Sequence, residues 1–270
     1  MSEPKTISIT ADFSFELPFE SDVLLQFEAA AIPEQEIISA ETVLPQAPYI
    51  ARVAAEDAIG ERIWLRGSGP LAVSYRAQVA VNRLLHDLSA LAALPPHSLP
   101  GGAVPYLFDS RYCQGSQFVA FTSEAFGHLH GGAKVVAMRD WIAANLAYTP
   151  GSSTPETTAV DTFHALQGVC RDYAHLLIAL ARAAAIPARF VSCFAPGVKP
   201  QDFHAVAEVF LADPTVPGGG AWHVVDATGM ADAAHAVKIG VGRDAADVSF
   251  LTSFGPTTYN GHTISVFVQD

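Results

Sequence analysis

The residue with the clearest chemical potential is Cys170, which stands in the run GVCRDYAHLLIALA at residues 168–181. The glycine before it and the apolar stretch after it predict a helix that begins at the cysteine. The first turn of a helix carries unpaired N–H groups and the positive end of the dipole, which favour an anion. A thiol in this place loses its proton more readily, and the thiolate is the nucleophile. The alternative is that Cys170 is a small buried apolar residue, as cysteines commonly are.

A cysteine nucleophile needs an imidazole that takes its proton and a third group that orients the imidazole. His204 lies 34 residues after Cys170, at the start of one predicted strand, and Asp226 lies 22 residues further on, at the end of the next. If the two strands pair antiparallel, the start of one lies beside the end of the other. The spacing permits a Cys-His-Asp site but does not require one, because the chain has ten histidines.

The elements that would position these residues follow from the apolar pattern. A buried helix is predicted at about residues 170–185, because Tyr173, Leu177 and Leu180 fall on one face and Pro187 prevents continuation. Strands are predicted at 188–194, 205–211 and 222–226, with a turn at 217–220, and helices at 134–148 and about 157–166. Strands joined by short turns after a buried helix predict an antiparallel sheet packed on that helix.

The first part of the chain has the two-residue alternation of strands instead. Five strands are predicted, at residues 6–15, 22–29, 49–54, 62–67 and 71–81. Such spacing predicts a small all-β sandwich. Paired prolines and glycines in PPHSLPGG, which starts at residue 95, interrupt regular structure. We therefore predict an N-terminal β-sandwich domain over residues 1–95 and a second domain over residues 96–270.

Net charge and cysteine content indicate which kinds of partner and which cellular compartment to expect. The chain has 15 basic and 27 acidic residues, a net charge of −12, which argues against nucleic-acid and anionic-membrane partners. The chain has three cysteines, and their spacing matches neither a CxxC motif nor a Cys/His metal site. We therefore predict no disulfide framework and no bound metal, and a reducing, cytoplasmic compartment. Neither a signal peptide nor an apolar stretch of membrane-spanning length is recognised.

The other residues of reactive type have simpler interpretations. Cys193 lies in an apolar strand and is expected to be inert core, and a packing role is also expected for Cys113. His128 and His130 alternate as metal ligands can, but no acidic or cysteine partner is near in sequence, so we predict a polar loop. His175, five residues into the cysteine helix, is expected to point away from the thiol.

Several motifs together carry a family resemblance. GVCRDYA at 168–174, with AIPAR at 185–189, resembles the first motif of the transglutaminase-like superfamily. HAVAEVF at 204–210 and WHVVDAT at 222–228 are similar to its second and third motifs, and GRDAADV at 242–248 extends the similarity. The chain most resembles bacterial transglutaminase-like candidate cysteine proteases, which carry an N-terminal β domain before the catalytic core.

The sequence departs from the family pattern at two positions. Val206 stands where the pattern has tryptophan, and Ala227 stands where it has proline. Neither is one of the three positions that match the catalytic triad.

The resemblance implies an α+β protein with a papain-like core, in which Cys170 is the nucleophile, His204 the acid/base and Asp226 the orienting group. Attack on a peptide or protein amide would form a thioester, with no cofactor. Water would complete a hydrolysis and an amine a transfer, while a non-catalytic binding module is a third possibility. The Cys170 N–H and a second donor would hold the oxyanion, and Gln167 and Tyr112 are the candidates for that donor. The sequence indicates no oligomeric state.

Overall fold

A four-stranded antiparallel sheet forms the middle layer of the protein. The computed structural model describes residues 5–83, 85–213, 215–216 and 219–269, so part of the turn predicted at 217–220 lies outside the described residues. The strands are β7 (Ala188–Phe194), β8 (His204–Ala212), β9 (Gly220–Val225) and β10 (Val237–Gly242). Their order is β10-β7-β8-β9, with all neighbours antiparallel.

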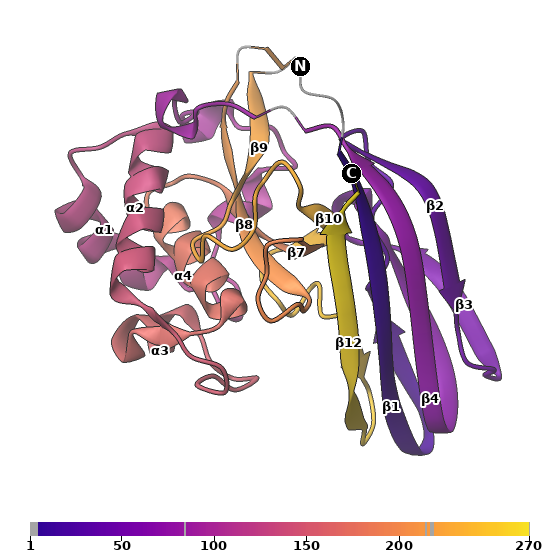
Figure 1. Ribbon diagram of the computed structural model, residues 1–270. Coiled ribbons are helices and arrows are strands. Elements are labelled where there is room, and N and C mark those ends of the chain that lie inside the picture. Colours follow the sequence, from indigo (N-terminus) through magenta and orange to yellow (C-terminus); the bar gives the residue numbers. More distant parts are fainter. Residues whose placement is uncertain (1–4, 84, 214, 217–218, 270) are drawn as a thin grey trace.

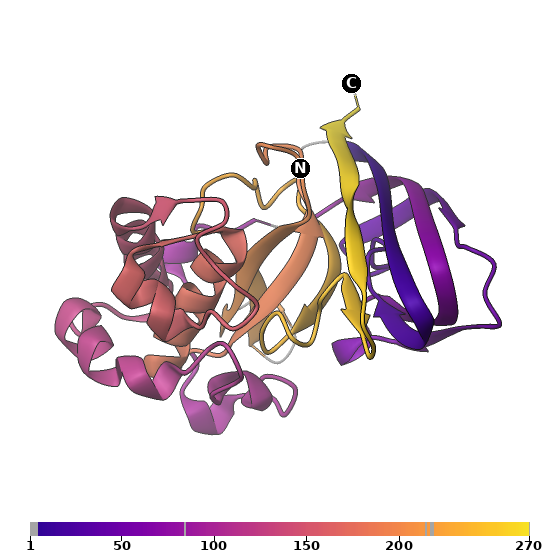
Figure 2. The same cartoon turned by 90° about the horizontal axis from the view of Figure 1, so that it is seen from below.

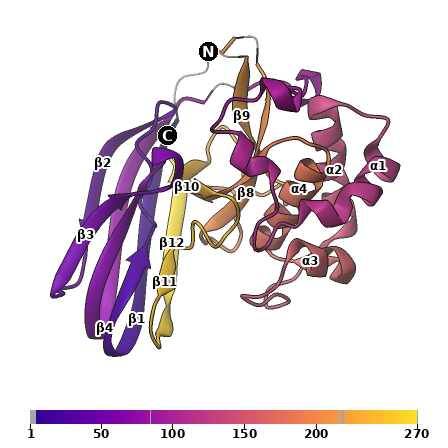
Figure 3. The same cartoon turned by 180° about the vertical axis from the view of Figure 1, so that it is seen from behind.

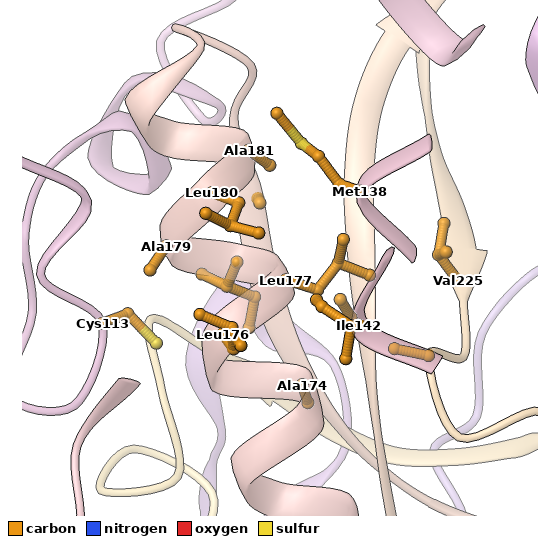
Figure 4. Packing of buried hydrophobic residues seen from close by; sticks show 14 of the residues in the cluster. Cys113, Met138, Ile142, Ala174, Leu176, Leu177, Ala179, Leu180, Ala181 and Val225 are labelled. Atoms are coloured by element: carbon orange, nitrogen blue, oxygen red, sulfur yellow. The ribbon is translucent and has the colours of Figure 1, made fainter. Parts of the chain in front are cut away.

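Helices cover one face of this sheet (Figure 1). They are α1 (Val119–Phe126), α2 (Gly131–Asn145), α3 (Ala159–Ala165) and α4 (Cys170–Ala183). Helix α4 is the central one, and its residues from Asp172 to Arg182 are all buried. Figure 4 shows Met138 and Ile142 of α2 on one side of α4 and Cys113 on the other. Two short strands, β5 (Ala147–Tyr148) and β6 (Gln167–Gly168), pair in parallel before α4.

A six-stranded sheet lies next to edge strand β10 of the middle sheet (Figure 3). Its strands are β1 (Lys5–Leu25), β2 (Gln35–Val43), β3 (Tyr49–Ala54), β4 (Glu61–Val81), β11 (Leu251–Ser253) and β12 (Thr258–Val268). Strand β12 runs along the side that faces the middle sheet (Figure 2). Phe194, Val237 and Ile239 of the middle sheet join the apolar core of the six-stranded sheet.

The six-stranded sheet folds over on itself and so forms the predicted sandwich. Strands β1 and β4 pair over their length except at a register shift between Leu17 and Ser21. Residues 18–20 are exposed there, and Gly69 on the paired strand has a φ of 77° that glycine adopts without strain. The two halves then face each other, and the rings of Phe13 and Phe27 meet at 5.1 Å between centroids.

Two partly buried ion pairs attach the sandwich to the middle sheet, and a fully buried carboxylate of the middle sheet joins them. The Arg189 guanidinium lies 2.8 Å from Asp57 and 2.7 Å from Glu208, and the Lys238 ammonium lies 2.6 Å from Glu34 and 2.5 Å from Glu208. Burial alone would raise the pKa of Glu208, but Lys238 and Arg189 outweigh it and lower that pKa to about 2. These contacts fix the two sheets relative to each other, which matters because both border the site described below.

The predicted α+β class, with a buried cysteine-bearing helix on an antiparallel sheet, is confirmed. The division at residue 95 stays a prediction, and strand pairing adds a feature to it, since β11 and β12 from the C-terminal end complete the N-terminal sheet. Within the described residues, no helix is both long and apolar enough to cross a membrane.

Candidate active site

Cys170 is the first residue of α4, and local contacts determine that the helix begins there. Val169 is extended, and its N–H donates to the Asp172 carboxylate at 2.8 Å, which closes the first turn. The Arg171 guanidinium lies 3.1 Å from the same carboxylate and offsets its charge. A side chain at Gly168 would lie 2.6 Å from the Asp172 Cβ, so only glycine fits before this turn. The Cys170 side chain itself is partly exposed.

The antiparallel pairing of β8 and β9 brings the second and third predicted residues together. His204 begins β8, Asp226 directly follows β9, and His204 Nε2 lies 3.0 Å from Asp226 Oδ2. Because this bond occupies Nε2, only the other ring nitrogen, Nδ1, can interact with the thiol. Nδ1 is buried and has no hydrogen-bond partner within the described part of the chain. Because Cys170 and His204 line the same cleft, Nδ1 is the nitrogen available to the thiol.

The Asp226 carboxylate is held firmly by the loop that follows β9. Thr228 donates to Oδ1 from both its N–H and its hydroxyl, each at 2.8 Å, and the Ala231 N–H donates to Oδ2 at 2.7 Å. Burial would raise the pKa of Asp226, but His204 and these donors outweigh it and hold the pKa below its usual value. An ionised carboxylate in a fixed position is what an orienting group requires.

The environment of His204 favours the imidazolium. Burial alone would lower the pKa of His204, but the Asp226 carboxylate and the Cys170 sulfur outweigh burial and raise that pKa to about 9. The ring is therefore charged at neutral pH. A cation beside a thiol stabilises the thiolate. The site can therefore hold a sulfur nucleophile on Cys170 next to a proton donor on His204.

The cleft that contains both side chains has a volume of about 580 Å³. Helix α4 and strands β7 and β8 supply one side, and β11 with the segment before it supplies the other. The rings of Phe203 and Phe250 stack on each other at 4.7 Å between centroids along this wall. Since β11 pairs with β1, the six-stranded sheet takes part in shaping the cleft through this C-terminal strand. Val206, the departure from the family motif, packs in a separate buried cluster and does not line it.

Sequence reasoning missed Tyr148, which the β5–β6 pair places beside the start of α4. Tyr148 pairs with Gly168, and the Thr149 N–H donates to the Gly168 carbonyl at 2.9 Å. Burial, followed by the nearby Cys170 side chain, raises the pKa of Tyr148 to about 12, and the smaller effect of the Cys170 backbone N–H in the opposite direction does not offset this. The phenol therefore stays protonated at neutral pH. Its position depends on a two-residue parallel pair, too short to leave a pattern in the sequence.

The two residues suggested as oxyanion donors lie elsewhere around the site. Gln167 is exposed on β6 and is not part of the cleft lining. Tyr112 does line the cleft, but its hydroxyl donates to the Pro155 carbonyl at 2.7 Å. Its ring stacks on His175, whose buried Nε2 accepts from the Ala245 N–H at 3.1 Å, so His175 has a packing position. Across the described ranges, no three His, Cys, Asp or Glu residues gather as metal ligands would.

The three cysteines are all unpaired and differ in environment. Cys113 and Cys193 are 0% exposed, and burial raises the pKa of each thiol. We expect iodoacetamide at pH 7 to alkylate Cys170 at least about tenfold faster than the other two, because only Cys170 combines exposure with a neighbouring cation. Peptide mass mapping over time measures the three rates, and the unfolded protein is the control in which they converge. Equally slow labelling of all three in the folded protein would contradict an activated thiol.

Comparison with known proteins gives a consistent family. Residues 121–227 match the transglutaminase-like superfamily. A solved structure of a candidate cysteine protease from Cytophaga hutchinsonii is 30% identical, with a TM-score of 0.91 over 100% of this chain and 92% of that chain. The periplasmic domain of TgpA from Pseudomonas aeruginosa is 17% identical, with a TM-score of 0.40 over 84% of this chain and 88% of that domain.

A curated relative, an uncharacterised protein of Mycobacterium leprae (strain TN), is 30% identical over 127 residues. These residues are 43% of this chain and 42% of the relative, so the match spans less than half of that protein. The full-length structural relative and the matched core region agree with each other. The chain belongs to the transglutaminase-like superfamily.

Proposed function

We propose that the protein is a cysteine-dependent amidase or peptidase, with Cys170 as nucleophile, His204 as acid/base and Asp226 as orienting group. The observation that carries the proposal is the buried His204–Asp226 bond, 3.0 Å long, whose imidazole shares a cleft with the partly exposed Cys170. The likeness to a candidate cysteine protease over the whole chain supports the same class.

The reaction has two stages. The Cys170 thiolate attacks the amide carbonyl, and collapse of the tetrahedral intermediate breaks the C–N bond as His204 gives its proton to the departing amine. The acyl group is then a thioester on Cys170. Water, deprotonated by His204, attacks the thioester, and the acid leaves while thiolate and imidazolium form again. A primary amine in place of water would give an amide, which is acyl transfer.

The oxyanion needs two donors, and we assign them to the Cys170 N–H and the Tyr148 hydroxyl. Within the described ranges, the backbone bonds of the first turn of α4 use the N–H groups of Asp172 and Tyr173 but not that of Cys170. The pairing of Tyr148 with Gly168 places the tyrosine near this N–H, and its phenol stays protonated at neutral pH. Both groups can therefore point at one oxygen at the start of the helix dipole.

Tyr148→Phe is expected to lower kcat by about 10²-fold with little change in KM, because a donor to the oxyanion acts mainly in the transition state. Steady-state kinetics on one peptide amide measures the split. Gln167→Ala and Tyr112→Phe are the comparison variants, and we expect each to lose less than Tyr148→Phe. If Tyr148→Phe kept the wild-type kcat, Tyr148 would not be the second oxyanion donor. The donor would then be the residue whose comparison variant loses kcat.

The proposed function is tested by trapping the acyl-enzyme. A library of amidated peptides is mixed with the protein, quenched in acid and analysed by intact mass, and the expected result is an acyl adduct that maps to Cys170. Product analysis with and without an added primary amine separates hydrolysis from transfer. Absence of any adduct, together with binding of library peptides to the unmodified protein, would favour a non-catalytic binding module. We propose a cytoplasmic location on the basis of the three unpaired cysteines.

A further inference from the structure

The cleft around Cys170 differs in charge from the rest of the protein. The chain carries 27 acidic and 15 basic residues. Yet the described residues that line the cleft include two arginines, Arg111 and Arg171, together with His204, and neither aspartate nor glutamate. Asp226 stands behind His204 and is 4% exposed, so its charge is directed at the imidazole. A cationic lining in an acidic protein favours a substrate that brings negative charge.

Of the two arginines, Arg171 is already engaged. Its guanidinium lies 3.1 Å from the Asp172 carboxylate and donates to the Thr154 carbonyl at 2.7 Å. These contacts offset its charge and fix its position. Arg171 therefore belongs to the support of the helix start.

Arg111 is exposed, and no acceptor within the described residues receives a hydrogen bond from its guanidinium. A contact with the neighbouring aromatic ring nevertheless restricts the position of its guanidinium. Its guanidinium carbon lies 5.0 Å from the centroid of the Tyr112 ring, a cation–π distance. That ring is itself fixed by stacking on His175 and by its bond to Pro155. Arg111 is thus a positioned cation on the wall of the cleft that holds Cys170, and its guanidinium donates to none of the protein groups that the structure describes.

We propose that Arg111 binds a carboxylate of the acyl-donor substrate, so that the enzyme prefers acidic peptide amides. This inference rests on the proposed function and names the substrate class of the same site. A guanidinium offers parallel donors that match both oxygens of a carboxylate. The carboxylate can be an acidic side chain near the scissile amide or the free C-terminus of a short peptide, and both present the same group to Arg111.

The test compares a charged with a neutral reagent at Cys170. The rate of alkylation by iodoacetate, divided by the rate by iodoacetamide, measures how strongly the cleft attracts a carboxylate independently of turnover. We expect Arg111→Gln to lower this ratio about three- to fivefold, the range of an exposed charge pair. Arg111→Lys keeps the charge and should retain most of the ratio. Added salt at 0.5 M should reduce the wild-type ratio towards that of Arg111→Gln.

Arg139→Gln is the matched control, because Arg139 is a partly exposed arginine of α2 that pairs with its neighbour Asp140 outside the cleft. It should leave the ratio unchanged. An equal ratio in wild type, Arg111→Gln and Arg139→Gln would overturn the inference and leave the proposed function intact. Failure of both reagents to label Cys170 in the wild type would instead contradict the proposed function.

Paired substrates distinguish the two sources of the carboxylate. Peptide amides that differ by glutamate against glutamine near the scissile bond test the side chain, and peptides with a free against an amidated C-terminus test the terminus. For the pair whose carboxylate binds Arg111, we expect the charged peptide to have a three- to fivefold higher kcat/KM than the neutral one. This difference should disappear in Arg111→Gln. Equal turnover within both pairs would overturn the inference.

Discussion

Replacement of Cys170 by alanine is expected to lower amide turnover by about 10⁴-fold or more, because loss of the nucleophile removes the thioester route altogether. The effect should fall on kcat, since the cleft and its Arg111 wall are unchanged. The acyl adduct seen by intact mass should also disappear. The fold should persist, because Cys170 is partly exposed and alanine suits the first turn of a helix.

Cys113→Ala is the matched control for this prediction. It removes the same atom from a residue that is 0% exposed in the helical core, and it should lower the melting temperature while leaving kcat within about twofold. If Cys170→Ala kept the wild-type rate, the chemistry would have to use another group, and the proposed mechanism would be wrong.

The position of the site could be predicted from sequence because strong local signals mark each of its parts. Cys170 stands where a glycine approach meets a long apolar helix, and His204 and Asp226 stand at the ends of consecutive strands. Antiparallel pairing of consecutive strands permits the two side chains to meet, and the family resemblance singles them out among the chain's histidines and aspartates. The structure brings them to 3.0 Å.

The parts that the sequence did not reveal depend on contacts between distant segments. Strand β12 pairs with β1, more than two hundred residues away, and no short-range pattern encodes such a partner. The predicted breaks near residues 18–20 and 68–70 are bends in continuous strands, because pairing between β1 and β4 carries both chains through them. Strand β11 could not be predicted for the same reason, since its partner β1 is distant in sequence. The contribution of the sandwich to the cleft wall was therefore not predicted either.

The pH dependence of the site provides the second large effect. Asp226→Asn keeps the shape of the side chain and removes its charge, and it is expected to lower kcat by about 10²–10⁴-fold. In the wild type, Asp226 and the Cys170 sulfur raise the pKa of His204 to about 9 against the opposing effect of burial. Without the carboxylate, burial dominates, the pKa of His204 falls, and the imidazolium is lost at neutral pH. Alkylation of Cys170 by iodoacetamide at pH 7 should slow accordingly.

Stability should change with pH in the direction set by the same shift. The pKa of His204 in the folded protein, about 9, lies above the unfolded value near 6.5. Protonation therefore stabilises the fold fully below pH 6.5, and this contribution is lost as the pH rises through about 9. The melting-temperature gap between wild type and Asp226→Asn should be widest near pH 6 and narrower at pH 9.5.

Asp232→Asn separates this effect from a general loss of charge near the site. Asp232 lies on the loop after Asp226, is 60% exposed, and also pairs with a histidine, His235, at 3.2 Å. The same chemical change there should leave three measurements unaltered, since an exposed pair contributes little. They are kcat, the Cys170 alkylation rate, and the alkaline limit of activity, which is the pH at which turnover falls as His204 loses its proton. If Asp226→Asn matched Asp232→Asn in all three measurements, the His204–Asp226 bond would have no part in the chemistry. If only Asp226→Asn lost rate and shifted its alkaline limit downward, the charge of Asp226 would be acting through the protonation of His204.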